Sequence, residues 1–145
     1  HCIAVDPWFI VHAGGKDAKM IRTAREVNTY KTEWAIEKIK NTALKFEFEN
    51  GRKAKVACMG LAFKPDIDDL RESPALYITR RLLADGLEVL PVEPNIKTLD
   101  EFELVEDEEA INDADIIVFL VAHDEFKGIR IFGKEVFDFC GVTNH

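Results

Sequence analysis

The sequence has 145 residues, of which 47% are apolar and 32% are charged, and its 19 basic and 27 acidic side chains give a formal net charge of −8. This length and composition are typical of one globular domain, or of one domain with a helical extension. The acidic balance argues against a nucleic-acid partner, because such proteins gather Lys and Arg on one face. The sequence has no run of about 18 apolar residues and no charged leader before an apolar stretch, so we expect neither a membrane span nor a secretion signal.

The cysteines are three in number, Cys2, Cys58 and Cys140, and are widely spaced. An odd set at this spacing fits neither a disulfide framework nor a zinc site, so we expect no bound metal. We expect a cytoplasmic, reducing compartment, in which a functional cysteine stays a thiol. The sequence starts with His1 rather than Met and reads from within a motif, which indicates a piece of a longer protein.

The first third of the chain is predicted to be a loop followed by helix. Residues 1–15 read as a loop, because a short apolar run is closed by Gly14 and its neighbouring glycine. From Asp17, the predicted N-cap, apolar residues recur at helical spacing as far as Asn50. A single helix would be about 45 Å long at roughly 1.5 Å per residue, enough to link two domains or to build a dimer interface. Two shorter helices broken near residues 29–32 are an equal alternative.

The rest of the chain alternates between strand and helix patterns. Strands are predicted over residues 55–59, 88–92, 115–121 and 135–139, and helices over 74–85 and 107–112. Ser73 followed by Pro74 is typical of a helix start, with Ser as the N-cap and Pro in the first turn. This alternation predicts an α/β fold in which a long connecting helix precedes a parallel sheet.

The segment between the first strand and its helix, residues 60–74, is unusually long, because an ordinary βα turn takes about 2–6 residues. It follows the carboxyl end of a strand, where open α/β sheets bind ligands. It lacks the G-x-G-x-x-G pattern of a dinucleotide loop but contains Lys64 and Arg71. Arg holds a phosphate bidentately and Lys acts as a point charge. A solvated loop whose charges pair with one another is an equal alternative.

Isolated reactive side chains give weaker signals. A lone cysteine such as Cys2 is most often a small buried hydrophobe, and a free thiol is mostly protonated at neutral pH. Asp6 is suited to position a water or a base, but a carboxylate raises a nearby thiol's pKa, so activation needs positive charge from elsewhere. We expect Cys58 in the core and Cys140 as a filler at a strand end. For His123 a surface or helix-cap role is favoured over a place in the ligand cleft.

Three stretches resemble the UDP-glucose/GDP-mannose dehydrogenase family. Residues 1–9, His-Cys-Ile-Ala-Val-Asp-Pro-Trp-Phe, resemble its active-site cysteine segment, and residues 21–28 resemble the start of its long central helix. Residues 60–74 resemble its G-x-x-F-K loop, which continues to D-D-x-R-E-S-P. The resemblance implies that residues 1–50 are the end of a central domain with a linker and dimerisation helix. It implies that residues 51–145 form a Rossmann-like UDP-sugar-binding domain.

The resemblance also implies an activity, the NAD-dependent four-electron oxidation of a UDP-sugar at C6 through a cysteine thioester. By the same resemblance Cys2 is the nucleophile and Asp6 assists proton handling around the thiol. Phe63 and Lys64 contact the nucleotide sugar, and Arg71 reaches NAD. A homodimer through the long helix is implied as well.

The segment around Cys2 most resembles the members of the family that act on UDP-N-acetyl-D-mannosamine, with UDP-N-acetylglucosamine and UDP-glucose as alternative substrates. The family's N-terminal Rossmann domain is absent from this sequence, together with a lysine and an asparagine of the active site. We therefore expect the chain alone to bind NAD poorly and to be inactive. A non-catalytic nucleotide-binding or dimerisation module is a third interpretation.

Overall fold

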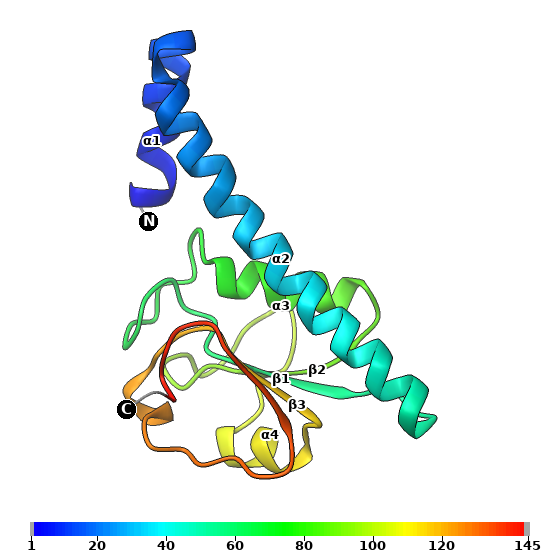
Figure 1. The fold of residues 1–145 in the computed structure, drawn as a ribbon. Coiled ribbons are helices and arrows are strands. Elements are labelled where there is room, and N and C mark those ends of the chain that lie inside the picture. Colours follow the sequence, from blue (N-terminus) through cyan, green and yellow to red (C-terminus); the bar gives the residue numbers. More distant parts are fainter. Residues whose placement is uncertain (1, 144–145) are drawn as a thin grey trace.

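A four-stranded parallel sheet forms the centre of the C-terminal part of the chain in a computed structural model, which describes residues 2–143 (Figure 1). Its strands are β1 (Lys55–Met59), β2 (Glu88–Val92), β3 (Ile116–Phe119) and β4 (Glu135–Asp138), in the order β2-β1-β3-β4. Every neighbouring pair is parallel, with Lys55 opposite Glu88 and Val56 opposite Ile116. The predicted α/β fold with parallel strands is confirmed.

The helices α3 (Pro74–Ala84) and α4 (Asp107–Asp113) connect these strands. Helix α3 begins as predicted, because the Ser73 hydroxyl accepts the backbone N–H of Leu76 at 3.2 Å and Pro74 lies in the first turn. A single 3₁₀ turn, η2 (Asp124–Phe126), follows β3.

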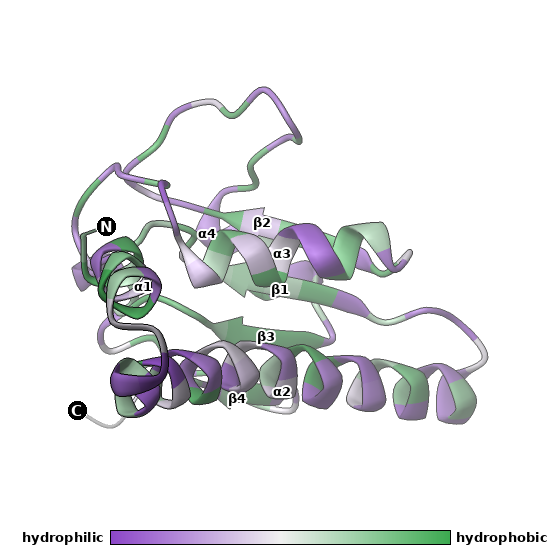
Figure 2. Ribbon diagram, turned by 90° about the horizontal axis from the view of Figure 1, so that it is seen from above, coloured by the Kyte–Doolittle hydropathy of each residue, from purple (hydrophilic) through white to green (hydrophobic). Residues whose placement is uncertain are grey.

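The two faces of the sheet are covered by different helices. Val56 and Cys58 of β1 pack with the buried residues of α2 (Lys19–Asn50) and α3, whereas Ala57 and Met59 pack with Ala110 of α4. Successive side chains of a strand point to opposite faces, so a strand covered on both sides is apolar throughout. Figure 2 shows β1 and β3 as hydrophobic ribbons with the more polar helices around them.

Helix α2 runs as one helix of 32 residues and ends where Gly51 takes a left-handed conformation. The alternative of two shorter helices is wrong, since residues 29–32 contain neither Gly nor Pro to break the helix. The predicted cap at Asp17 is also wrong: Asp17 lies in a 3₁₀ turn, η1 (Gly15–Ala18), and no side chain caps α2. The C-terminal half of α2 packs on the sheet, while its N-terminal half extends beyond it (Figure 1).

The first segment of the chain is a helix, α1 (Cys2–Gly14), and not the predicted loop. It lies alongside the N-terminal half of α2 and buries Val11 (Figure 1). Pro7 lies inside α1 and removes one helical hydrogen bond, so packing against α2 has to stabilise the helix. Within residues 2–143 no helix is both long and apolar enough to cross a membrane.

Candidate functional site

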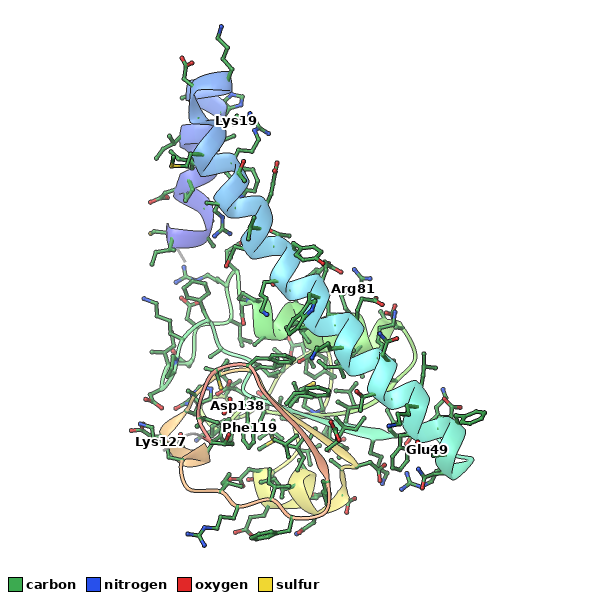
Figure 3. The ribbon with its side chains drawn as sticks, in the orientation of Figure 1. Lys19, Glu49, Arg81, Phe119, Lys127 and Asp138 are labelled. Atoms are coloured by element: carbon green, nitrogen blue, oxygen red, sulfur yellow. The ribbon has the colours of Figure 1, made fainter. Side chains whose placement is uncertain are left out.

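The order of the strands marks one edge of the sheet as a candidate ligand site. From β1 the chain goes to β2 on one side, and it then crosses to β3 on the other side of β1. In open parallel sheets, ligands bind outside the carboxyl ends of the strands at such a reversal. Residues 60–74 follow β1 and residues 120–126 follow β3 at this edge. Figure 3 shows Phe119 and Asp138, the last residues of β3 and β4, toward the same side of the molecule as Lys127.

Gly60 starts the β1–α3 loop, residues 60–73, in close contact with the segment that follows β3. Its backbone has a φ of +89°, and a Cβ at this position would lie 2.6 Å from the Cβ of Val121. Both observations require a glycine, because other residues rarely adopt this φ and no real side chain approaches so closely. The loop therefore leaves the sheet directly beside the segment that follows β3.

A buried carboxylate, Glu93, holds the next two residues of the loop. Its Oε2 accepts the backbone N–H groups of Leu61 at 2.7 Å and Ala62 at 2.9 Å, and its Oε1 accepts that of Asn95 at 3.0 Å. Burial raises the pKa of Glu93, but hydrogen bonds from His123, Leu61 and Asn95 outweigh it and hold the pKa below its ordinary value. Glu93 is therefore a buried anion whose charge is stabilised by donors from three segments.

His123 is fully buried beside Glu93, so the predicted surface or helix-cap role is wrong. Its Nδ1 accepts the Asp66 backbone N–H at 2.9 Å, and its Nε2 lies 3.1 Å from Glu93 Oε2. Because Nδ1 accepts a hydrogen bond, the proton of the neutral ring is assigned to Nε2, which donates it to Glu93. The ring also packs edge-on against Phe126, with centroids 5.5 Å apart. The turn after β3 is thus joined to the β1–α3 loop.

The far end of the loop is closed by Ser73. Its hydroxyl lies 2.6 Å from the carbonyl oxygen of Leu61 and 3.1 Å from that of Ala62, besides capping α3. Between these ends, the backbone N–H of Phe63 donates to the carbonyl oxygen of Asp69 at 2.8 Å. The loop is therefore ordered by contacts to its own backbone and to Glu93, and the charge pairing expected of a solvated loop is present between Arg71 and Asp69.

Phe63 and Lys64 follow directly after the residues that Glu93 holds. Phe63 is half-buried and Lys64 is exposed. Among residues 2–143 no carboxylate forms an ion pair with the Lys64 ammonium. An exposed cation at the carboxyl edge of a parallel sheet is suited to an anionic ligand.

Arg71 lies farther along the same loop. Its Nε and Nη2 donate to the two carboxylate oxygens of Asp69 at 2.9 and 2.7 Å, which keeps the pKa of Asp69 well below its ordinary value. Its own pKa is raised, first by the hydrogen bonds to Asp69 and to a smaller extent by an electrostatic interaction with Cys2. Arg71 and Cys2 therefore lie within electrostatic reach of each other, although 69 positions separate them in the sequence. The Arg71 side chain is 69% exposed, so it remains open to a ligand.

Cys2 and Asp6 lie at the start of α1, both exposed and four residues apart, a spacing that places them on one face of a helix. Figure 1 shows this end of α1 above the β1–α3 loop. The other cysteines differ. Burial raises the pKa of Cys58 to about 12, which confirms its predicted place in the core, and that of Cys140 to about 11. Cys2 is the exposed thiol of the three.

One group of side chains has the residue types of a metal site. Atoms of Asp66, His123 and Glu125 that are able to bind a metal lie within 4.8 Å of one another. The lone pair of His123 Nδ1 already accepts the Asp66 N–H, and Nε2 faces Glu93. Neither ring nitrogen is free to bind an ion, so this group does not form a metal site as it stands.

Glu93 is the residue that sequence reasoning missed. The available signal was its position: it directly follows β2, as Gly60 follows β1 and Leu120 follows β3. Polar residues at the carboxyl ends of neighbouring parallel strands meet at the same edge of the sheet. Once the strand order is known, a polar network at this edge can be predicted.

Residues 57–145 match the model of the UDP binding domain of the UDP-glucose/GDP-mannose dehydrogenase family. The chain belongs to this family. It is 46% identical, over 97% of its length, to a UDP-N-acetyl-D-mannosamine dehydrogenase of Campylobacter jejuni. It is 45% identical, over 98% of its length, to an NDP-N-acetyl-D-galactosaminuronic acid dehydrogenase of Ralstonia solanacearum. The resemblance inferred from residues 1–9, 21–28 and 60–74 is confirmed.

The fold is shared with solved members of the family. The structure of a UDP-N-acetyl-mannosamine dehydrogenase from S. aureus superposes on all of this chain with a TM-score of 0.80 at 33% identity. This chain covers 35% of the Campylobacter protein, 34% of the Ralstonia protein and 35% of the S. aureus structure. It thus spans about a third of the length of the relatives that it matches.

Proposed function

We propose that this chain is part of an NAD-dependent nucleotide-sugar 6-dehydrogenase that oxidises UDP-N-acetyl-D-mannosamine at C6 to the uronate. The supporting observation is the shared location of Cys2, Arg71 and the β1–α3 loop, in a chain 46% identical to a UDP-N-acetyl-D-mannosamine dehydrogenase. In this proposal residues 1–50 end a central domain and carry the nucleophile. Residues 51–145 bind the UDP-sugar.

Cys2 is the proposed nucleophile. Its sulfur attacks the C6 aldehyde formed in the first oxidation and gives a thiohemiacetal, and the loss of a hydride from that carbon leaves a thioester. Water then cleaves the thioester, which releases the carboxylate and restores the thiol. The Arg71 guanidinium supplies the nearby positive charge that a thiolate needs, and Asp6 on the same face of α1 positions the water or takes up its proton.

Lys64 and Phe63 are the proposed contacts to the nucleotide sugar. An ammonium without an ion-pair partner among the described residues attracts the diphosphate, while the half-buried ring offers an apolar surface beside it.

The cofactor that this reaction requires is NAD, two molecules of which would in turn each take up one of the two hydrides released from C6. Arg71 fits a role in holding it, because Asp69 fixes one edge of the guanidinium and 69% of the side chain remains exposed. Residues 60–74 contain no G-x-G-x-x-G cradle for a dinucleotide. We therefore assign the remaining NAD contacts to parts of the whole protein outside this chain.

A homodimer through the long helix is part of the proposal. Helices α1 and α2 expose large apolar side chains along the arm that extends beyond the sheet: Ile3, Phe9, Met20, Val27 and Tyr30. Exposed apolar side chains concentrated on one arm favour a protein interface.

The test is NADH formation by the full-length protein with a panel of UDP-sugars that includes the N-acetyl-mannosamine, N-acetyl-galactosamine, N-acetylglucosamine and glucose forms. We expect the first to be oxidised fastest. The similar identity to the Ralstonia protein makes the galactosamine form the second candidate. We expect Cys2→Ser to abolish NADH formation and to leave UDP-sugar binding intact, whereas Cys140→Ser, at a half-buried position just after β4, leaves both intact. No oxidation of any sugar would favour a non-catalytic nucleotide-binding module.

A further inference from the structure

Two buried side chains hold the backbone on both sides of residues 63–65. Before this segment, Glu93 Oε2 accepts the N–H groups of residues 61–62 at 2.7 and 2.9 Å. After it, His123 Nδ1 accepts the N–H of Asp66 at 2.9 Å. Since His123 Nε2 lies 3.1 Å from the same Glu93 oxygen, the two contacts form one connected network.

This network is sealed from water. The side chains of Glu93 and His123 have no exposed surface. Hydrogen bonds in such surroundings are strong, and a buried donor that loses its acceptor is penalised by the full loss of solvation. A change in either side chain is therefore transmitted to the loop backbone.

Asp66, which directly follows residues 63–65, has a strained backbone conformation that other contacts must stabilise. Its φ of +60° lies in the left-handed region, which residues other than glycine seldom adopt. Two hydrogen bonds fix it in that state: its N–H donates to His123 Nδ1, and its Oδ1 accepts the N–H of Asp124 at 2.8 Å. Without the first bond, the strained residue is able to relax and move the three residues before it.

We propose that His123, supported by Glu93, is a positioning residue that fixes the backbone of residues 63–65 and so directs the Phe63 ring and the Lys64 ammonium toward the nucleotide sugar. The inference rests on the proposed function, which assigns these two side chains to the substrate. The side chains of His123 and Glu93 are buried beneath the loop and have no exposed surface for a substrate to contact.

Two substitutions of His123 separate the contact to the loop from the contact to Glu93. In His123→Asn, the side-chain oxygen takes the place of Nδ1 and still accepts the Asp66 N–H, but the link to Glu93 is lost. In His123→Gln, the terminal amide takes the place of Nε2 and still donates to Glu93, but the Asp66 N–H has no acceptor. His123→Asn loses the contact to Glu93 alone, whereas His123→Gln loses the contact to the loop and also the contact of Nδ1 to the Asn95 side-chain amide at 3.1 Å.

The experiment measures KM and kcat of the full-length enzyme for its UDP-sugar, together with hydrogen exchange at the backbone amides of residues 61–64 and 66. We expect His123→Gln to raise KM about tenfold, because only a fraction of loops then has the competent conformation, and to speed exchange at Asp66. We expect His123→Asn to keep KM within about twofold of wild type, because the Asp66 N–H keeps its acceptor and the loop keeps its competent conformation. In both variants kcat changes less than KM.

A KM that is equal in the Asn and Gln variants would overturn the proposal, because the pair would then act only in core packing. Faster exchange in His123→Gln without a change in KM would overturn it too. If the wild-type enzyme oxidises no UDP-sugar, the proposed function fails. Exchange at residues 61–66 then still decides whether His123 holds the loop.

A second pair of variants does not depend on the folding of a buried substitution. Asp124 is exposed, and His123 before it has a backbone (φ −63°, ψ 149°) that tolerates a following proline. Asp124→Pro removes the N–H that holds Asp66 Oδ1, whereas Asp124→Ala keeps that N–H; both lose the ion pair with Lys127. We expect a several-fold higher KM for the proline variant alone, and equal values would count against the proposal.

Discussion

Replacement of Gly60 by alanine tests whether the close contact between the β1–α3 loop and Val121, in the segment after β3, is required. A non-glycine residue at a φ of +89° is strained by about 1–2 kcal/mol. The new Cβ would also meet the Cβ of Val121 at 2.6 Å and its backbone N and O at 3.1 Å, and overpacking of this kind costs about 1–3 kcal/mol. We therefore expect Gly60→Ala to lower the free energy of unfolding by about 2–5 kcal/mol.

Gly86→Ala is the matched control for this prediction. Gly86 has a φ of +83°, but nothing lies within 4 Å of the position that a Cβ would take. Its substitution therefore introduces backbone strain alone, about 1–2 kcal/mol. Urea unfolding of the 145-residue chain, followed by circular dichroism, measures both variants. Equal losses of stability would refute the steric argument, and so would a larger loss for Gly86→Ala.

Two further predictions concern pH and thiol chemistry. Burial of the Asp138 carboxylate is outweighed by hydrogen bonds from Thr143 and the neighbouring backbone, which hold its pKa well below the ordinary 3.8. The ionised Asp138 carboxylate contributes fully to stability above about pH 4, and this contribution is lost as the pH falls below that value. Acid unfolding, followed by fluorescence, should therefore depend less on pH below about pH 4 in Asp138→Asn than in wild type. Iodoacetamide at neutral pH should modify Cys2 and spare Cys58, whose pKa burial raises to about 12; mass spectrometry showing Cys58 modified first would contradict this.

Local signals in the sequence were sufficient for most of the α/β domain. Ser73 and Pro74 define a helix start by their own chemistry, and the apolar run of residues 55–59 is typical of a strand buried on both faces. The segment 2–14 was not predictable in this way. Pro7 and the glycines at its end favour a loop locally, and the helix forms because α2 offers it a surface to pack on.

The candidate site was predicted only in part, for a physical reason. The resemblance to the family proposes Cys2, Lys64 and Arg71 one by one, but the proximity of Cys2 to Arg71 depends on how α1 folds back along α2. The roles of Glu93 and His123 depend on the strand order, which brings the ends of β1, β2 and β3 together. A lone His after a strand gives no sign that its partners lie 30 and 57 positions away.

The unbroken course of α2 has a consequence for motion. Its 32 residues extend about 48 Å; one half is packed on the sheet and the other half carries α1. Because α2 contains neither Gly nor Pro, its continuous backbone hydrogen bonds resist bending between the half that carries α1 and the half that packs on the sheet. Under the proposed function, we therefore expect the start of α1 and the β1–α3 loop to keep their relative positions when substrate enters or product leaves the whole protein.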